Sequence, residues 1–518
     1  MTKQYDCIIV GAGIAGQTLA RSLANTRIHV AILDSGTAVR DKSKDFLNEF
    51  ISTEQSFRTD YLNRVRQIGG ASNIWAGRLM RLTEEDLCPR PWLSSNGWPI
   101  SYADLKKYYK EVDKEFKVEW AWENQQCKDV RYTPKARSTE YARSVWTKSI
   151  PRYGVKSKSW KQIRSNKQME VFSNCTLIKV IDSGSNGIYA NCVMDGKDLT
   201  LHTKIIVLAT GGIENVRIML DSHKTNGTYF STDNANIGKY FMDHPKWISP
   251  ALKLNNAILI NRFLTKTYLN GSIKDGVKFC VNRQKELKVT NPYAEISLKM
   301  DPLYEEALAR IISIYKSHSL SGTLKIKKGD ISAAINTLYL INPSAKMPHC
   351  LRLGLQYVKN KFRLKLHAKS IVITIHLENS PSLESAIVRL PKKNRYGCSE
   401  IAVNWKVSDR DIESANALYK ELVEGLIKEN IVDRQYASEL VTRDFITDAS
   451  HHMGGTCMSR TESEGVVDKN LNYWGSRGIY IVGSSVFPTS GHANPTYTIV
   501  ALSIRLGRHL RKIFGVEE

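Results

Sequence analysis

The sequence predicts a fold of the α/β plus α+β class, in which a parallel-sheet domain built from discontinuous segments is joined to a second domain containing an antiparallel sheet. Three observations predict it: two buried β-branched runs that each end in glycine, an alternating basic and apolar run in the middle of the chain, and a helical C-terminal stretch with a basic end. With 518 residues, the chain exceeds the ~250–300 residues at which one core stops growing, so two domains or one large composite are expected.

The composition is that of a soluble globular protein, with 42% hydrophobic and 24% charged residues. It excludes a disordered, collagen-like or low-complexity chain. No stretch approaches the ~18 apolar residues that cross a bilayer, and the N-terminal MTKQYDCIIVGAG leaves no room for a signal peptide. Nine cysteines lack CxxC spacing, so neither a disulfide framework nor a zinc site is expected, and a reducing cytoplasm fits best.

The net charge of +23, from 74 Lys and Arg against 51 Asp and Glu, bears on partners rather than on fold. An anionic substrate, an acidic polymer, nucleic acid or an anionic membrane surface would each suit it, and so would a merely solvated surface. No nucleic-acid module and no aromatic–basic interleaving is visible, so no nucleic-acid partner is expected. A small-molecule substrate, with an anionic one among the candidates, and a peripheral membrane contact are left open.

The first strong motif lies close to the N-terminus. Tyr5–Val10 is a short apolar run, as expected for a strand buried on both faces, and it leads into a GxGxxG whose glycines are Gly11, Gly13 and Gly16. The first glycine makes a tight turn, the second lets the backbone approach a pyrophosphate, and the third permits close packing of helix on strand. The helix that follows offers free N–H groups to phosphates at its N-terminus.

A second apolar run, Ile28–Leu33, ends in Asp34, which is placed to accept hydrogen bonds from a ribose. Strand, glycines, helix, strand and terminal acid in register predict a dinucleotide site in a Rossmann-type domain. The alternatives are a glycine-rich turn in an unrelated α/β protein and a Rossmann-type domain that has lost its nucleotide.

A similar junction occurs far along the chain. Ile205–Leu208 reads as a buried strand, Ala209 and Gly211 belong to the small-residue turn after it, and Glu214–Leu220 reads as a helix. Small residues at this place let backbone lie against an adenosine. Because distant segments then close over one long cofactor, FAD is favoured over a mobile NAD.

The last seventy residues carry candidate chemistry. His452 stands in an HHMGGTCM run (451–458), a strand is expected at Gly478–Val482, and Asn494-Pro495 reads as an N-cap and first position of the C-terminal helix. In a structural interpretation, Asn494 is only a helix cap, and His452 and His492 are loop histidines whose ring nitrogens have hydrogen-bond partners within the protein. In a functional one, His452 is a base, Asn494 is a neutral donor beside it, and the helix N-terminus stabilises negative charge.

The sequence resembles the glucose–methanol–choline (GMC) oxidoreductases, which are FAD enzymes. Beyond the N-terminal fingerprint, the resemblance rests on GGASNIWAG (69–77), GKYFMDHP (238–245), NWK (404–406) and the C-terminal motif. GWPISYADL (97–105) is typical of the branch nearer pyranose oxidase and bacterial sugar dehydrogenases. The resemblance covers roughly residues 1–110, 165–245 and 440–518.

The resemblance implies roles for particular residues. His452 falls on the family's active-site histidine and Asn494 on its partner position, whereas His451 and His492 fall on neither and are interpreted as neighbours. Ile74 stands where some relatives attach FAD covalently through histidine, so non-covalent FAD is predicted, and no metal is needed. Cofactor contacts are expected at Gly11, Gly13, Gly16, Asp34, Gly70, Asn73, Ala76, Leu177, Ala209, Gly211, Gly483, Ser484 and Thr496.

The implied function is oxidation of a hydroxyl of a sugar or sugar-like substrate, with hydride transfer to flavin N5 and His452 as general base. Two alternatives stay open: a lyase-type relative without net redox chemistry, and a redox-silent nucleotide-binding or escort protein. The electron acceptor (oxygen, quinone or another) is open too, with a dehydrogenase slightly favoured over an oxidase.

The expected domains are an FAD-binding domain at 1–245, a substrate domain at 246–445 and a C-terminal return at 446–518. Residues around 85–165 are expected to belong partly to the substrate lobe. Strand patterns at Lys361–Leu366 and Ser370–Leu377 predict an antiparallel sheet behind the active site. Helix-like stretches at 303–316, 331–341 and 351–358 are interpreted as a lid or ordinary packing, ahead of a dimer contact or membrane-surface patch.

Overall fold

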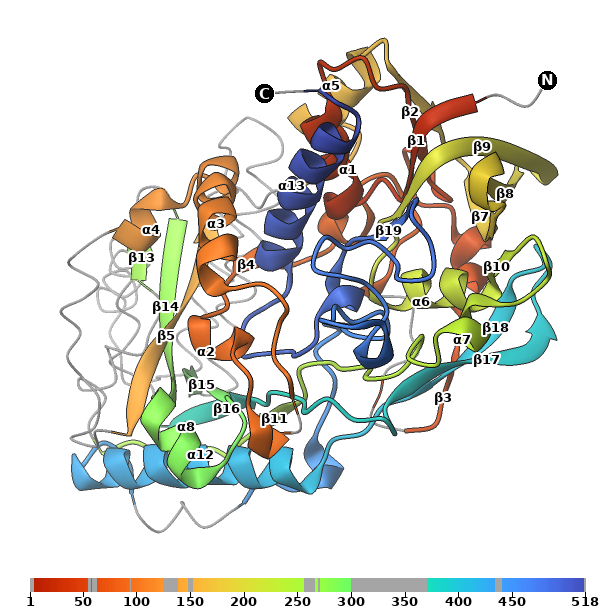
Figure 1. Ribbon diagram of the computed structural model, residues 1–518. Coiled ribbons are helices and arrows are strands. Elements are labelled where there is room, and N and C mark those ends of the chain that lie inside the picture. The colour runs from red at the N-terminus through yellow and green to blue at the C-terminus, as the bar shows by residue number, and fades with distance from the viewer. Residues whose placement is uncertain are drawn as a thin grey trace, which may run out of the picture.

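The computed structural model describes residues 4–54, 57, 63–93, 95–123, 138–147, 152–255, 266–268, 271–299, 370–433 and 440–516. In these ranges the chain forms three sheets with helices packed on them, which confirms the predicted fold class (Figure 1). The stretches expected at 303–316, 331–341, 351–358 and 361–366 lie outside the described residues. No helix in the described part of the chain is long and apolar enough to cross a membrane.

The first sheet is mixed. It contains the parallel strands predicted from the glycine motifs, and its strand β8 runs antiparallel to both of its neighbours. Its strands run in the order β10-β7-β8-β9-β1-β2-β6, and β19 pairs with the end of β9. The central strand β1 pairs in parallel with β2 and β9, and its residues 7–10 are buried because neighbours cover both faces. The strands are β1 (Gln4–Val10), β2 (Val30–Leu33), β6 (Met169–Phe172), β7 (Cys175–Asp182), β8 (Ile188–Met194), β9 (Lys197–Leu208), β10 (His223–Lys224) and β19 (Ile479–Ile481).

Helices from both ends of the chain pack beside this sheet. The first and last helices, α1 (Ile14–Leu23) and α13 (Thr496–Ile513), lie side by side (Figure 1). They come close because Gly507 has no side chain: a Cβ there would stand 2.3 Å from Ser22 Cβ. The other helices of this half are α3 (Tyr102–Phe116), α4 (Glu119–Glu123), α5 (Lys158–Ser165), α6 (Gly212–Asp221) and α7 (Phe230–Asp233).

The second sheet is antiparallel and has two unlike faces. Trp247 and Ile375 are opposite partners on its apolar face, and Trp247 meets Tyr419 of α12 (Asp409–Lys428) with ring centroids 5.1 Å apart. In Figure 1, α12 runs along this sheet together with α8 (Val281–Leu287). The opposite face carries polar residues, because side chains alternate along a strand. The strand order is β11 (Lys246–Ile248), β16 (Ser370–His376), β15 (Tyr293–Lys299), β14 (Gly271–Phe279), β5 (Thr139–Thr147) and β4 (Arg78–Leu79), with β12 (Leu252–Lys253) on β16 and β13 (Lys266–Tyr268) on β14.

A third, small sheet joins distant segments of the chain. It contains β17 (Ala386–Lys393), β18 (Ser399–Asn404) and β3 (Ile51–Ser52), with β18 and β3 parallel. After it the chain returns to the first sheet through β19. On the way, Met453 pairs with Met242, and this pairing brings the HHMGG run beside the first sheet.

Candidate active site

A cavity of about 600 Å³ opens at the carboxyl ends of the parallel strands. Ligands of open α/β sheets bind at this edge. Segments far apart in the sequence line it, and they come from the glycine turn, the end of β2, the loop before β4, the end of β9 and the C-terminal motif. The lining falls within residues 10–15, 33–35, 48, 63–67, 70–78, 175–177, 209–214, 218, 449–452, 483–484 and 494–499.

The glycines of the GxGxxG divide into two kinds. Gly11 has φ +100°, and a Cβ there would stand 2.5 Å from Ala209 O, so the two glycine turns lie against each other. Gly13 lines the cavity, and a Cβ there would meet nothing within 4 Å. Gly16 does not line the cavity, because it faces the turn itself: its Cβ would stand 1.8 Å from Gly11 O. Gly16 therefore serves the packing of α1 on β1.

Asp34 lies at the cavity wall directly after β2 and is buried. Its carboxylate accepts hydrogen bonds from the backbone N–H of Ala12 and of Gly36, both at 2.7 Å. Burial raises its pKa, against the opposing effect of these hydrogen bonds. The carboxylate thus holds the glycine turn, and each oxygen keeps a lone pair for a ribose hydroxyl.

Most of the other residues predicted from the sequence also line the cavity. Asn73 does not: its amide donates to Ile68 O at 2.9 Å and so braces the loop from inside. Ile74 lines the cavity, at the position where some relatives carry the covalent histidine. The predicted residues found in the lining are Gly11, Gly13, Asp34, Gly70, Ala76, Leu177, Ala209, Gly211, Gly483, Ser484, Thr496, His452 and Asn494.

The partner of Asn494 differs from the one predicted. Its amide nitrogen lies 3.0 Å from Nε2 of His451, which the sequence treated as a neighbour only, and no hydrogen bond joins it to His452. Asn494 does not act as the N-cap either, because Pro495 holds that position and α13 begins at Thr496. The side-chain amide of Asn494 is therefore hydrogen-bonded to the imidazole of His451 and not to the backbone of α13.

His452 also lines the cavity, and its Nε2 is buried without a hydrogen-bond partner among the described residues. The imidazole packs against Phe241 and Phe57, with ring centroids 6.1 and 5.7 Å away. Burial lowers the pKa of His452 to about 3, and the positive charge of Arg64 acts in the same direction. Near neutral pH the imidazole is therefore uncharged and able to accept a proton.

Asp243 was not singled out from the sequence, although it lies in the GKYFMDHP segment. Its buried carboxylate accepts the backbone N–H of His244 (2.6 Å), Ala449 (3.0 Å) and His451 (2.9 Å). One of its oxygens is 4.0 Å from Nε2 of His452. Burial, reinforced by Asp448, raises the pKa of Asp243 to about 7. This carboxyl fixes the backbone that carries both histidines.

Two arginines at the wall were likewise missed, and their only sequence signal is NRVRQIGG (63–70). Arg66 pairs with Glu214 at 2.9 Å. Arg64 has no carboxylate partner among the described residues, its Nε lacks a hydrogen bond, and its guanidinium lies 4.9 Å from the centre of the Phe50 ring. Burial, together with the charge of Arg66, lowers the pKa of Arg64 to about 9. Its Nη2 donates to Asn48 O, and the negative charge of Glu214 favours its charged form. A cation at this wall without a carboxylate in contact favours an anionic ligand group.

These features fit a long dinucleotide. The turn at Gly13 and the turn at Gly211 leave open space where other residues would carry a Cβ, and the N-terminus of α1 points its free N–H groups into the same region. Asp34 and Asn494 both belong to the lining of this cavity.

The fold and the cavity define a dinucleotide-binding protein of the flavoprotein class. Residues 384–503 match the family model described as GMC oxidoreductase. This match covers only the C-terminal part of the chain, and the residues described above fit FAD, the cofactor of the GMC oxidoreductases that the sequence resembles.

Similar proteins are known at low identity. The chain is 28% identical to a C-glycoside 3-oxidase of Arthrobacter globiformis over 119 residues, an alignment that covers only 22% of this chain and 22% of that protein. It is 22% identical to the fructose dehydrogenase large subunit of Gluconobacter japonicus over 97% of both chains. An FAD-dependent oxidoreductase from Chaetomium thermophilum has the same fold, with a TM-score of 0.57 and 15% identity over 99% of this chain and 100% of that one.

Proposed function

We propose that the protein oxidises a hydroxyl group of a sugar or sugar-like substrate to a carbonyl, with FAD as the hydride acceptor. The observation that carries the proposal is the unpartnered, buried Nε2 of His452 at the wall of the cavity that holds the dinucleotide motifs. The relatives named C-glycoside 3-oxidase and fructose dehydrogenase support a sugar as the substrate class.

The chain's own residues would hold the cofactor without a covalent bond. Gly11, Gly13 and the N-terminus of α1 would bind the diphosphate, and Asp34 the ribose. Ile74 has no nucleophilic atom, so it cannot bond to the flavin. When bound, FAD would supply the acceptor for the hydride, which carries the two electrons of the oxidation.

His452 would take the proton of the substrate hydroxyl at Nε2. Loss of that proton makes the carbon a much better hydride donor, and a positioned base contributes ~10²–10⁴-fold to the rate. The imidazolium that forms would be stabilised by Asp243, one of whose oxygens is 4.0 Å away. Asn494 would donate an amide N–H to the substrate oxygen and so hold the carbon in place for transfer.

The test is anaerobic mixing of the yellow protein with a panel of sugars, nucleotide-sugars and simple alcohols, followed by the loss of flavin absorbance. His452→Ala is expected to keep its FAD and to lose ~10²–10⁴-fold in bleaching rate. The exposed His29 supplies a matched control, since His29→Ala is expected to bleach at the normal rate.

Three other outcomes count against the proposal. An unchanged rate in His452→Ala would remove this residue from the chemistry. A protein that no alcohol bleaches would favour the redox-silent binding protein, and turnover without flavin reduction would favour the lyase. Reoxidation of the bleached protein by oxygen or by a quinone then separates an oxidase from a dehydrogenase.

A further inference from the structure

We propose that His244 and His451 are positioning residues that fix the orientation of the Asn494 amide, so that this amide presents N–H rather than oxygen to the substrate. They do so through a one-directional chain of hydrogen bonds that starts at two backbone carbonyls of the loop 489–494. The role toward substrate rests on the function proposed above, whereas the chain itself can be tested without it.

The chain starts at His244, which is buried. Its Nε2 lies 2.9 Å from Gly491 O and 3.3 Å from Ser490 O. Carbonyl oxygens only accept hydrogen bonds, so Nε2 of His244 must carry the proton. Burial lowers the pKa of His244 to about 4. The ring is therefore neutral near pH 7, and its Nδ1 has a lone pair.

The next link is His451, which lines the cavity. Its Nδ1 lies 3.0 Å from Nδ1 of His244. Because the His244 nitrogen is an acceptor, the proton of this contact belongs to His451. Burial and the neighbouring His244 hold the pKa of His451 well below its usual range, so this ring is also neutral and its Nε2 has a lone pair.

The last hydrogen bond of the chain fixes the orientation of the Asn494 side-chain amide. Nε2 of His451 is an acceptor, and 3.0 Å away stands the amide nitrogen of Asn494, which donates. A flipped amide would place its oxygen against the imidazole lone pair, replacing a hydrogen bond by repulsion. Only one orientation of Asn494 is compatible with the chain, and it leaves the second amide N–H available at the cavity wall.

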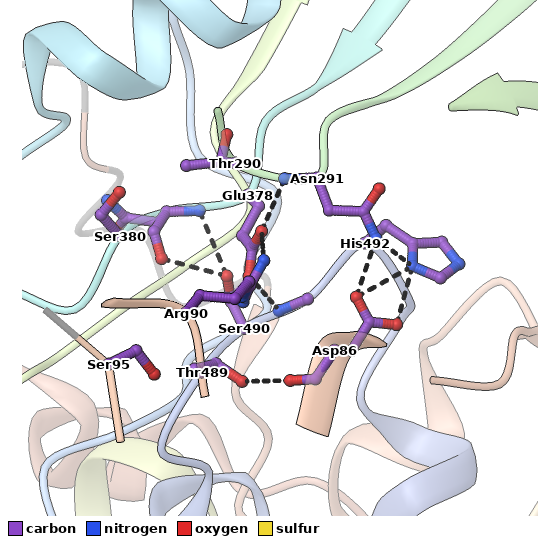
Figure 2. A network of polar contacts seen from close by, with 12 residues as sticks. Asp86, Arg90, Ser95, Thr290, Asn291, Glu378, Ser380, Thr489, Ser490 and His492 are labelled. Carbon is purple, nitrogen blue, oxygen red and sulfur yellow. Dashed lines mark hydrogen bonds and ion pairs between the residues drawn. The ribbon is translucent and has the colours of Figure 1, made fainter. Parts of the chain in front are cut away.

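A buried network holds the two carbonyls in place (Figure 2). Arg90 and Glu378 form a bidentate ion pair, with Arg90 Nη1 donating to Glu378 Oε2 at 2.6 Å. Oε1 of Glu378 accepts the backbone N–H of Gly491 at 3.2 Å. On the other side of the loop, His492 Nδ1 lies 3.1 Å from Asp86 Oδ2. The loop is thus clamped on both sides of its carbonyls, and the start of the chain is fixed.

Histidine tautomers test the chain directly. In holoprotein labelled with ¹⁵N-histidine and free of substrate, long-range ¹H–¹⁵N correlations should show His451 protonated at Nδ1 and His244 at Nε2. Their signals are assigned by their disappearance in His451→Gln and His244→Gln. A His451 protonated at Nε2 overturns the proposal, whether or not the protein oxidises an alcohol.

Two variants at His244 test whether the hydrogen-bond chain affects the rate of flavin reduction. His244→Gln keeps a donor for the carbonyls and an acceptor for His451, whereas His244→Leu removes both. His244→Leu is expected to lose on the order of 10-fold in flavin reduction rate, as when a partner that orients a catalytic group is lost, with little change in KM. His244→Gln should recover most of that rate, and both variants should keep their FAD.

The variants also separate this proposal from the general one. If His244→Leu reduces its flavin at the normal rate with an unchanged His451 tautomer, the chain is not positioning Asn494. If His244→Leu fails to fold, the tautomers of the unmodified protein still decide, since a His451 protonated at Nδ1 supports the chain and a His451 protonated at Nε2 refutes it.

Discussion

Single residues of this site act through their charge as well as their contacts. Arg64 is a partly buried cation without a carboxylate partner in the described ranges, and its charge disfavours protonation of His452. Asp243 faces the same imidazole at 4.0 Å, and burial raises its pKa to about 7. The basicity of His452 is therefore lowered by burial first and by the charge of Arg64 second.

Arg64→Gln should raise the pKa of His452, because it removes a positive charge that opposes the imidazolium. An imidazole with pKa about 3 stays neutral well below pH 5, so the acidic limb of the reduction rate should move to higher pH in the variant. Anaerobic reduction rates across the acidic range measure this limb. Arg27→Gln, at an exposed position, should leave it unchanged, and an unmoved limb in Arg64→Gln would contradict the assignment.

Residue types were predictable here, but their pairing was not. The two histidines of the HHMGG run and Asn494 lie in the lining of the cavity. Which histidine meets Asn494 depends on a backbone that Asp243 holds from more than two hundred positions away, through Ala449 and His451. No local pattern contains that information.

At the scale of elements, the glycine turn between β1 and α1 combines two different demands. Gly16 faces Gly11 O at a distance no side chain tolerates, whereas Gly13 faces open space and adopts φ −76°. One glycine is therefore needed by the fold and the other by the ligand.

A matched pair of substitutions separates these demands. Gly16→Ala should lower the melting temperature of the apoprotein, because overpacking costs about 1–3 kcal/mol, and it should bind FAD poorly as a consequence. Gly13→Ala should keep the melting temperature and weaken FAD binding only, since its methyl group enters the cavity. Melting curves and FAD titration measure both effects, and an equal melting temperature for the two apoproteins would be evidence against this division.

The elements themselves followed from the sequence where their signature is local. The strands at 5–10 and 205–208 and the helix after Gly211 lie where predicted, because buried parallel strands read as short apolar runs. The second strand begins at Val30 rather than Ile28. The small sheet of β17, β18 and β3 was not predicted, because its strands come from segments that pair only across the folded chain.

On the scale of the whole molecule, polar contacts between distant segments decide how the site is held. Asp86 meets His492 across 406 positions of the chain, and Arg90 meets Glu378 across 288. Burial opposes ionisation of Asp86, but His492 and Lys278 hold its pKa well below the usual range. The sequence contains these residues without any sign of their pairing.

The proposed domain boundaries near 245 and 445 stay predictions.

The folded protein as a whole should lose stability as the pH falls from neutral. Burial lowers the pKa of His244 to about 4 and the pKa values of His376 and His452 to about 3. Between these values and the unfolded pKa of ~6.5 the unfolded chain binds more protons, so acidification favours unfolding. Asp243 opposes this trend, because its pKa is raised to about 7 and the folded state keeps its proton. The carboxyls of Asp34, Asp411 and Glu429, whose pKa values burial also raises, act in the same direction as Asp243. His451 adds a further lowered pKa, and we expect the four histidines to dominate.

The melting temperature of the holoprotein, measured at constant ionic strength from about pH 7.5 to about pH 5, should therefore fall steadily. His376→Gln should make the decline shallower, because one group that gains a proton on unfolding is gone while the paired histidines of the active site are kept. A melting temperature that stays level or rises on acidification would mean that these imidazoles are not held neutral by the fold. In that case the hydrogen-bond directions derived for His244 and His451 would lose their basis as well, because a doubly protonated ring has no lone pair with which to orient its neighbour.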